Sequence, residues 1–564
     1  MVKHQWNLEA IKFYDYISDV KRKKELFKKL RESDVTIAVV DDGIQYPDKD
    51  NSNPTVIDDF NSFKKDLSKG TDKVGLNDIW WPNSEDSHGT NCASVMISSG
   101  NKLYGTAPGL SFCSYRTTFE EASLSLLLKN NINMIDIFNC SYGLDEGVVQ
   151  TNFKQNESII KGVTDGRNGK GCIYVFCSGN ESSMRDHAHF DPILNLPETL
   201  VVGATNMSNK RSNYSDTGSL LLCVAPSGDL DNDDMGLLVF DSNYTLDDVE
   251  GTSFSAPQVS GMVGVMLTLR PDLMWHDVKD IISRSCMKND LNAGKGGNID
   301  DTPWFTNMDK RHFNLQYGFG LIDYGKIIEN TMKHKLLPER SSFYINLPFT
   351  EAINNAVLGE QENISFKINP NKIMKILNKP IVKNLENFII QEISLIFALP
   401  ENTNSAKVHE LDIKISVNNR YENDYNKQDV IIGRGVDFEV YNDDIFLPIT
   451  IEFMKGEKLM IDGKFSEWTV HIKDINPETP QIGSLIGVEF HGYEIPAVIP
   501  VVKDINMRED ISAITSYDGS IVKVKSENNN FSFMINKKNK KDEFVVLNKI
   551  KKPMYNLLKD KYKN

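Results

Sequence analysis

Four short apolar runs in the first 335 residues constrain the fold of this chain more than any other feature. The runs are 35–43, 134–143, 172–180 and 198–206, and each ends in a polar or glycine-rich turn. Continuous apolar runs of this length are typical of parallel strands that are buried on both faces. Segments of helical spacing, 119–130 and 255–271, alternate with them. The alternation predicts an α/β fold with ligand chemistry at the carboxyl ends of the strands.

The pattern changes after about residue 340. The segments 409–419, 446–453 and 465–474 alternate apolar and polar residues with period two, and Asn- and Asp-rich turns separate them. This pattern predicts a β-sandwich or jelly roll. We therefore divide the chain into an α/β domain (1–335), a β-sandwich domain (340–500) and a Lys- and Asn-rich tail (505–564). The tail is expected to be solvated, although an anchoring role for its basic cluster stays open.

The composition excludes several classes of protein. The 564 residues carry a net charge of −15, which argues against general nucleic-acid binding. No run of 18 apolar residues is present, and the N-terminus lacks the apolar stretch of a signal peptide. The seven cysteines have no paired spacing that indicates a disulfide framework. The basic segment 19–31 has helical spacing and is predicted to bury one apolar face.

Three short segments carry the residues of a catalytic triad. VVDDG places Asp41 at the end of a predicted strand, DSHGTNCAS places His88 before a helix, and EGTSFSAP places Ser253 at the start of another. A serine is a weak nucleophile by itself, so a histidine must accept its proton, and an aspartate must orient that histidine. Each motif alone is common. Together, in this order and in these contexts, they predict a nucleophilic serine hydrolase.

Asn180 follows another apolar run, in the segment CSGN. Its amide group at a strand end is suited to donate a hydrogen bond to the oxyanion that forms during acyl transfer. The alternative is an asparagine that simply favours a turn. We predict that Asn180 is the oxyanion donor.

These motifs make the first 335 residues similar to the catalytic domain of subtilisin-like serine proteases, specifically the kexin and furin (proprotein convertase) branch. The features that carry the resemblance are QWNL, VDDG, HGTNC, SYGLDEG, GTSFSAP and QYGFGLIDYGKI. The segments VHELDIKIS and FSEWTVHIKD resemble the P domain that follows in this family. The resemblance implies a serine endopeptidase that cleaves precursor proteins after Lys-Arg or Arg-Arg pairs through an acyl-enzyme.

The resemblance also implies a set of carboxylates that bind the basic side chains of the substrate. These acids are Asp42 for the second subsite, with Glu85 or Asp86 beside it, Asp191 for the first, either Asp145 or Glu146 at the pocket, and Glu121 for the fourth. SYGLDEG is one residue shorter than the segment of the family, so the choice between Asp145 and Glu146 stays open.

A calcium ion is the cofactor that the resemblance implies, because clustered carboxylates need a compensating hard cation. Its ligands would be Asp186, Asp216 and either Asp145 or Glu146, and a second site would use Asp50. The neighbouring histidines, His187 and His189, are interpreted as exposed loop residues.

Two further classes of function remain as alternatives. One is a degradative subtilase of broad specificity, and the other is a catalytically inactive binding protein. The expected partners are polypeptides with paired basic residues, and we expect a monomer. The resemblance implies the secretory pathway (Golgi or extracellular), although the sequence shows neither a signal peptide nor a transmembrane segment. Cys92 either confers sensitivity to thiol reagents or is a buried, inert cysteine.

Overall fold

A computed structural model describes most of the chain as far as residue 495 and short strands beyond it. The described residues are 4–45, 71–72, 86–100, 102–143, 148–149, 153–182, 187–230, 234–241, 245–295, 302–307, 309–347, 361–367, 369–375, 382–383, 385–399, 411–417, 428–431, 439–440, 445–461, 464–474, 484–495, 511–515, 521–527, 530–536 and 550–551. The chain forms two compact units, Met1–Glu494 and Ile495–Asn564.

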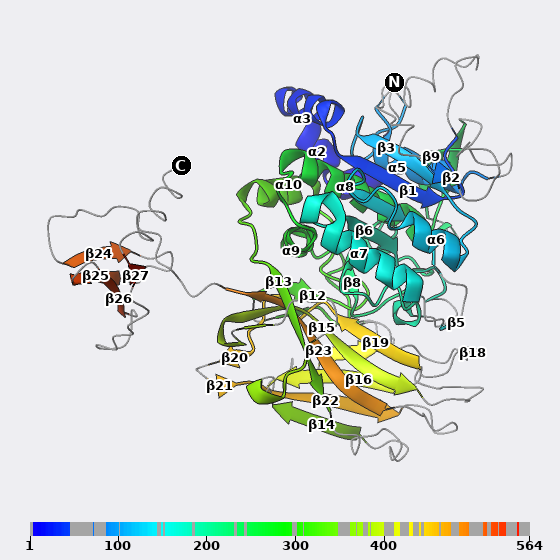
Figure 1. Ribbon diagram of the computed structural model, residues 1–564. Helices are drawn as coiled ribbons and strands as arrows, with labels where there is room; N and C mark the ends of the chain where they lie inside the picture. The colour runs from blue at the N-terminus through cyan, green and yellow to red at the C-terminus, as the bar shows by residue number, and fades with distance from the viewer. Residues whose placement is uncertain are drawn as a thin grey trace. The chain divides into compact units, whose positions relative to one another are not determined.

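A seven-stranded parallel sheet is the centre of the first 335 residues (Figure 1), with strand order β2-β3-β1-β4-β6-β7-β8. Its strands are β1 (Thr36–Asp41), β2 (Thr71–Asp72), β3 (Ser111–Arg116), β4 (Ile137–Cys140), β6 (Ile173–Cys177), β7 (Thr199–Thr205) and β8 (Leu221–Pro226). In β1, β4, β6, β7 and β8, burial on both faces explains the largely apolar sequences. Because all neighbours are parallel, the carboxyl ends of the strands meet at one edge.

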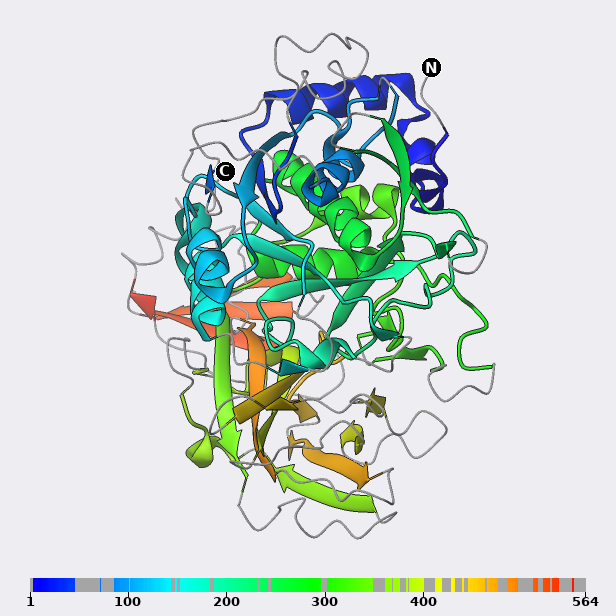
Figure 2. The same ribbon diagram turned by 90° about the vertical axis from the view of Figure 1, so that its right-hand side faces the viewer.

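Helices flank this sheet, as the sequence predicts (Figures 1 and 2). They are α1 (Trp6–Ala10), α2 (Phe13–Ile17), α3 (Val20–Glu32), α5 (His88–Ile97), α6 (Glu121–Leu127), α7 (Phe153–Gly169), α8 (Thr252–Leu269), α9 (Trp275–Ser285) and α10 (Tyr324–Lys333). Helix α8 is buried almost throughout and packs against β4, β6 and β7 as well as α5. It begins at Thr252, three residues before the predicted segment, so Ser253 lies in its first turn.

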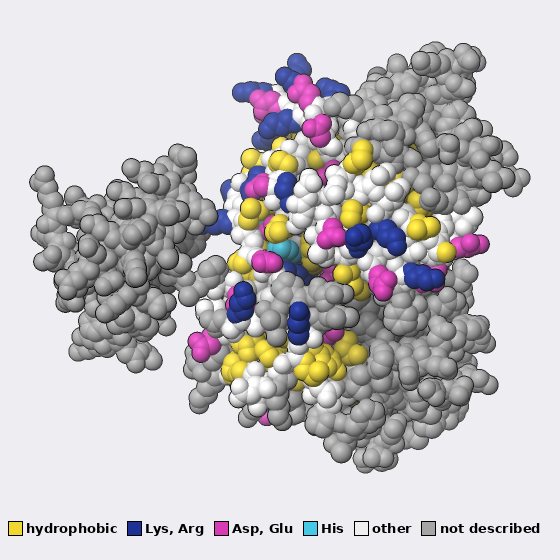
Figure 3. All heavy atoms as spheres, in the orientation of Figure 1, with side chains coloured by type: hydrophobic (Ala, Val, Ile, Leu, Met, Phe, Trp, Pro, Cys, Tyr) yellow, Lys and Arg dark blue, Asp and Glu magenta, His cyan; other side chains and the backbone are white. Residues whose placement is uncertain are grey.

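The basic segment forms helix α3. Asp19 caps it by accepting a hydrogen bond from the Arg22 amide at 2.9 Å. Leu26, Phe27 and Leu30 are buried on one side of the helix, in agreement with the predicted apolar face. The other side carries the Lys and Arg side chains that appear dark blue over α3 in Figure 3.

Antiparallel strands follow α10, and they form two four-stranded sheets. The first, in the order β13-β23-β15-β19, contains β13 (Arg340–Asn346), β15 (Phe388–Leu399), β19 (Ile445–Ile451) and β23 (Ser484–Glu494). The second, in the order β14-β22-β16-β17, contains β14 (Gln361–Lys367), β16 (Leu411–Val417), β17 (Gln428–Ile431) and β22 (Glu467–Asp474). Trp468 of β22 and Phe490 of β23 meet between the sheets, with ring centroids 5.3 Å apart. The antiparallel region agrees with the predicted β-rich fold.

The domain boundaries themselves stay predictions. The boundary at 335–340 falls between α10 and β13, yet both regions belong to the same compact unit. That the tail is solvated stays a prediction, and the structure places a four-stranded antiparallel sheet in this part of the chain. That sheet consists of β24 (Ile511–Thr515), β25 (Ile521–Glu527), β26 (Asn530–Asn536) and β27 (Ile550–Lys551). Alternating apolar residues in IVKVKSE and NFSFMIN account for the strands, a pattern that the Lys and Asn content obscures.

Within the described ranges, none of the helices is both long and apolar enough to cross a bilayer. All seven cysteines are described and buried, and none of them forms a disulfide bond.

Candidate active site

Asp41 and His88 form a hydrogen-bonded pair at the carboxyl edge of the sheet. Asp41 ends β1 and is fully buried, and its Oδ1 lies 2.8 Å from Nδ1 of His88, the first residue of α5. Close packing of α5 on β1 requires a glycine after His88, because a Cβ at Gly89 would lie 2.3 Å from the carbonyl oxygen of Gly43. Burial opposes the imidazolium, but the charge and hydrogen bond of Asp41 raise the pKa of His88 well above its ordinary value.

Ser253 lies in the first turn of α8, and its hydroxyl donates to the carbonyl oxygen of Ser141 at 3.2 Å. In return, the hydroxyl of Ser141 donates to the carbonyl oxygen of Ser253 at 2.8 Å. Among the described residues, no hydrogen bond joins Ser253 to His88. Rotation about one side-chain bond re-aims the hydroxyl, and such catalytic contacts often form only when substrate is bound.

Asn180 is oriented by the start of α8. Its Oδ1 accepts hydrogen bonds from both the amide and the hydroxyl of Thr252, each at 2.8 Å. Since the carbonyl end of the side chain is fixed, the amide hydrogens point away from Thr252. Gly251, just before Thr252, has a φ of +128°, a backbone conformation that favours glycine. That the side-chain amide of Asn180 donates to an oxyanion stays a prediction.

Asp42 links the two elements that carry Asp41 and His88. Its carboxylate accepts hydrogen bonds from the amides of His88 at 3.1 Å and Gly89 at 2.8 Å, which stabilises the start of α5. Burial and the charge of Asp41 raise the pKa of Asp42 to about 6. Arg116, which sequence reasoning missed, donates to the carbonyl oxygen of Asp42 at 3.0 Å.

Asp86, one of the two acids predicted to assist Asp42 at the second subsite, lies 3.5 Å from a guanidinium nitrogen of Arg116. An internal cation therefore already pairs with one of the acids predicted for the substrate. Arg116 is only 6% exposed. It ends β3 and pairs in register with Asp41 of β1, so a prediction of β3 from the sequence would have placed Arg116 beside the triad.

Asp191 lies close to the segment that contacts Ser253. A Cβ at Gly143, two residues after Ser141, would lie 3.8 Å from Oδ2 of Asp191. The other oxygen, Oδ1, accepts from the amide of Ile193 at 3.0 Å. The structure thus brings the predicted first-subsite acid to the same edge as the triad.

Asp216 is 3% exposed and approaches the backbone just before Asn180. A Cβ at Gly179 would lie 2.1 Å from Oδ2 of Asp216 and 3.2 Å from Oε2 of Glu181, so two carboxylates converge there. Gly179 has a φ of +107°, which favours glycine independently. Glu181 also accepts a hydrogen bond from the backbone amide of Asn180 at 2.6 Å. The sequence analysis did not identify Glu181.

Several predicted site residues cannot be compared with the structure. Asp50, Glu85, Asp145, Glu146 and Asp186 lie outside the described residues. Glu121 begins α6 and is half-buried, and among the described residues it has no contact with the triad.

The interpretation of His187 and His189 as exposed was wrong. They are 6% and 0% exposed, and their rings stack with centroids 5.3 Å apart. Burial lowers the pKa of His189 to about 4, so its ring is neutral. The sequence could not indicate this burial, because the partners of His189 include Ser219, in a separate loop.

Cys92 lies against the triad from the next turn of α5. Its Sγ is 3.9 Å from Nδ1 of His88 and 3.4 Å from the carbonyl oxygen of Ser253. The donor atoms of Asp41, His88 and Cys92 lie within 4.8 Å of one another. Burial raises the pKa of Cys92, which favours the inert thiol over the reactive one.

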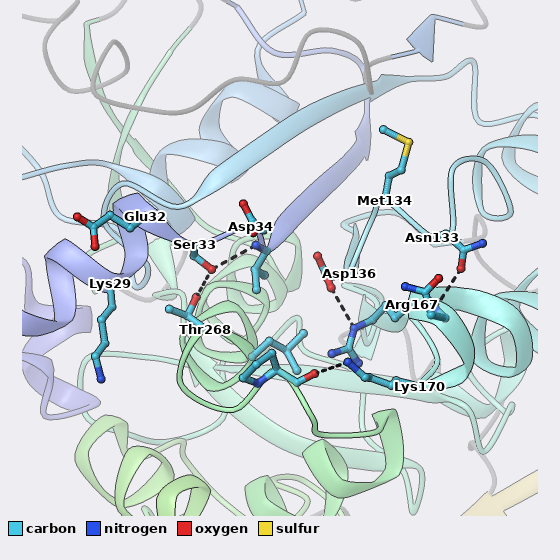
Figure 4. A pocket seen from close by; sticks show the side chains of 14 residues that line it. Lys29, Glu32, Ser33, Asp34, Asn133, Met134, Asp136, Arg167, Lys170 and Thr268 are labelled. Carbon is cyan, nitrogen blue, oxygen red and sulfur yellow. Dashed lines mark hydrogen bonds and ion pairs between the residues drawn. The ribbon is translucent and has the colours of Figure 1, made fainter.

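A cavity of about 720 Å³ lies at the opposite edge of the sheet (Figure 4). Asp34 and Asp136, which line it, precede β1 and β4, whereas the triad follows the carboxyl ends of the strands. Arg167 in this cavity is held by an ion pair with Asp136 at 3.0 Å. The cavity is therefore separate from the triad.

Residues 32–320, more than half of the chain, match the subtilase family, peptidase S8. This protein is a subtilase. The matched range contains all three triad residues and Asn180.

The subtilase resembles kexin and related processing proteases. Kexin of Saccharomyces cerevisiae is 26% identical over 378 residues, which cover 64% of this chain and 43% of kexin. Proprotein convertase subtilisin/kexin type 4 of Homo sapiens is 28% identical over 311 residues, which cover 52% of this chain and 38% of that protein. The matches thus span less than half the length of these two relatives.

Among solved structures, the serine protease of Aeromonas sobria has the same fold. Its TM-score is 0.62 at 18% identity, and the likeness covers 82% of this chain and 89% of that chain. The shared fold therefore extends beyond residues 32–320.

Proposed function

We propose that this subtilase is a calcium-dependent serine endopeptidase of the kexin type that cleaves polypeptides after paired basic residues. The observation that carries the proposal is the position of two carboxylates around the triad. Asp42 lies beside His88, and Asp191 lies beside Gly143 in the segment that contacts Ser253. Carboxylates in these places match the basic side chains that precede the scissile bond in the proposed substrates.

The residues of the triad supply the chemistry. When the Ser253 hydroxyl turns to His88, Nε2 accepts its proton while Oγ attacks the carbonyl carbon of the substrate. Asp41 stabilises the imidazolium through Nδ1, and the amide of Asn180 donates to the oxyanion. His88 then gives the proton to the leaving amine, which leaves an acyl ester on Ser253. Water, activated by the same imidazole, hydrolyses the ester and restores the serine.

Calcium belongs to the proposal because the predicted pocket acids would otherwise repel one another. Asp216 and Glu181 supply two converging carboxylates, the donor type that Ca²⁺ prefers. Together with Asp186 and either Asp145 or Glu146, Asp216 would hold the ion and stabilise the loop that carries Asp191. The resemblance to kexin and furin also supports a P domain in residues 340–500 and a location in the secretory pathway.

Hydrolysis of fluorogenic peptides tests the proposal. The purified chain should cleave a peptide ending in Lys-Arg with kcat/KM at least about 100-fold above its Lys-Leu counterpart, because a site built to pair with a cation rejects a substrate that lacks it. Chelation of Ca²⁺ should abolish turnover, and its return should restore it. Ser253→Ala should lower kcat by roughly 10⁶.

The alternatives predict different results. Equal cleavage after Arg and Leu would favour the broad-specificity subtilase. A folded protein without turnover at any Ca²⁺ concentration would favour the inactive binding protein. Activity that survives in Ser253→Ala would mean that Ser253 is not the nucleophile.

A further inference from the structure

The loop between β6 and β7 carries Asp191. The side chain of Asn195 forms hydrogen bonds with residues on the opposite side of this loop. Asn195 donates from Nδ2 to the carbonyl oxygens of His189 at 2.6 Å and Asp191 at 3.3 Å. Its Oδ1 lies 2.7 Å from Nδ1 of His189. Asn195 is fully buried, so its position determines the path of the backbone on both sides of Asp191.

Asn195 is itself held from a strand that lies 255 residues further along the chain. Thr450 of β19 donates from its amide to Oδ1 of Asn195 at 3.3 Å and from its hydroxyl to the backbone carbonyl of Asn195 at 2.5 Å. Thr450 also accepts at its own carbonyl from the hydroxyl of Ser219 at 2.9 Å, and Ser219 contacts His189. All of these groups are buried.

A second contact fixes the same loop near its end. Lys279 of α9 donates to the carbonyl oxygen of Pro197 at 2.7 Å and pairs with Glu452, just beyond β19. The amide of Glu452 also donates to the carbonyl oxygen of Ser219 at 2.9 Å. The loop is therefore held to the antiparallel region at two places, directly at Asn195 and through Lys279 at Pro197.

We infer that Thr450 is a positioning residue for Asp191, so that the antiparallel region sets the preference of the protease for a basic residue before the scissile bond. The inference rests on the proposed function, in which Asp191 receives that side chain. Thr450 acts through Asn195 and has no contact with the triad among the described residues. A displacement of Asp191 weakens its pairing with Arg but removes no ion pair from a substrate with Leu at that position.

The test compares kcat/KM for peptides that end in Lys-Arg and Lys-Leu. Thr450→Val removes the hydroxyl that holds Asn195 and keeps the volume of the side chain. The ratio of Arg to Leu should fall roughly tenfold, because misplacement by about an ångström is costly in oriented sites. Cleavage of the Leu peptide should stay near its original rate. Thr450→Ser, which retains the hydroxyl, should preserve the ratio.

Ser394→Ala is the matched control. Ser394 is buried in β15 and contacts the hydroxyl of Thr450 at 3.1 Å, but it does not touch Asn195. This variant should leave the Arg-to-Leu ratio unchanged. If Thr450→Val fails to fold, Asn195→Ala removes the same link from the other side and should lower the ratio at least as much.

The double variant Asp191→Ala/Thr450→Val distinguishes a positioning role of Thr450 from a general loss of structure. In the Asp191→Ala background, Thr450→Val should not change the Arg-to-Leu ratio further, because the carboxylate it positions is absent. Two results would overturn the inference while the proposed function stands. One is an Arg-to-Leu ratio that Thr450→Val leaves unchanged. The other is a fall in that ratio that is as large in the Asp191→Ala background as in the wild type. A wild-type protein without preference for Arg would overturn both.

Discussion

The carboxyl group of Asp42 lies between the catalytic pair and the proposed second subsite. Its raised pKa, about 6, results from burial and from the charge of Asp41. Above this pH the group is ionised and attracts a lysine in the substrate, and below it the attraction is lost. KM for a Lys-Arg peptide should therefore fall roughly tenfold between pH 5 and pH 7, equivalent to about 1.4 kcal/mol.

An Ala-Arg peptide provides the comparison, since it offers no cation to Asp42. Its KM should change much less over the same range, and Asp42→Asn should flatten the profile for Lys-Arg. Identical pH profiles of KM for the two peptides would show that Asp42 does not bind the substrate.

The thiol of Cys92 lies next to the catalytic histidine, yet we expect it to be unreactive. It touches His88, but burial raises its pKa, so little thiolate exists at neutral pH. Iodoacetamide at pH 7.5 should leave the activity within about 20% of its initial value over a period in which an exposed thiol with a pKa of about 8.5 reacts fully. Rapid inactivation that Cys92→Ala prevents would show that the thiol is accessible and reactive.

At the scale of elements, the start of α8 positions both Ser253, the proposed nucleophile, and Asn180, the proposed oxyanion donor. Because Thr252 fixes the carbonyl end of Asn180, Asn180→Ala removes an oriented donor that acts mainly in the transition state. We expect kcat to fall by roughly 10²–10³ with little change in KM. Steady-state kinetics with the Lys-Arg peptide measure both. A rise in KM at constant kcat would instead assign Asn180 to substrate binding.

The loop from His187 to Thr199 responds to acid through His189. Burial lowers its pKa to about 4, whereas the unfolded chain has a pKa of about 6.5, so unfolding takes up a proton between these values. Stability is therefore fully present above pH 6.5 and is lost as the pH falls toward 4. Between pH 7 and pH 4.5 this group alone accounts for about 2 kcal/mol.

Urea unfolding of the wild type and of His189→Gln at both pH values measures this contribution. The variant starts less stable, but it should lose about 2 kcal/mol less than the wild type on acidification. Equal losses in the two proteins would mean that His189 does not account for the acid sensitivity.

Local patterns predicted the elements that carry the triad, because burial on both faces leaves a continuous apolar run in β1 and β6. The same reasoning located Asn180 at a strand end. It did not predict the hydrogen bonds between Ser141 and Ser253. The segment SYG directly after a strand could have indicated that Ser141 lies near the triad. Reasoning from local patterns also misjudged His189, whose environment includes Thr450 through Asn195 and depends on packing between distant segments.

At the scale of the whole molecule, a buried group of charges joins α9 to the antiparallel region. Lys279 lies 2.5 Å from Glu452 and 3.3 Å from Glu392 of β15, and Lys455 lies 2.7 Å from Glu392. All four side chains are at most 2% exposed. Burial alone would raise the pKa of Glu392, but the surrounding cations hold it well below its ordinary value. Arg340 of β13 also pairs with Glu392, at 2.7 Å, so the three cations surround the two carboxylates only while both regions stay packed together.

Lys279→Met should therefore lower the free energy of unfolding by about 3–5 kcal/mol, because it breaks the buried ion pair with Glu452 and leaves that carboxylate with Lys455 as its remaining cation. The matched surface change is Lys326→Met, which breaks the exposed pair with Glu329 and should cost at most about 1 kcal/mol. Urea unfolding of the full chain measures both. In Lys279→Met/Glu452→Leu, which removes the cation together with one carboxylate, much of the loss should be recovered. A single variant as mild as the surface control would mean that water reaches these charges, and that the two regions are held together by apolar packing alone.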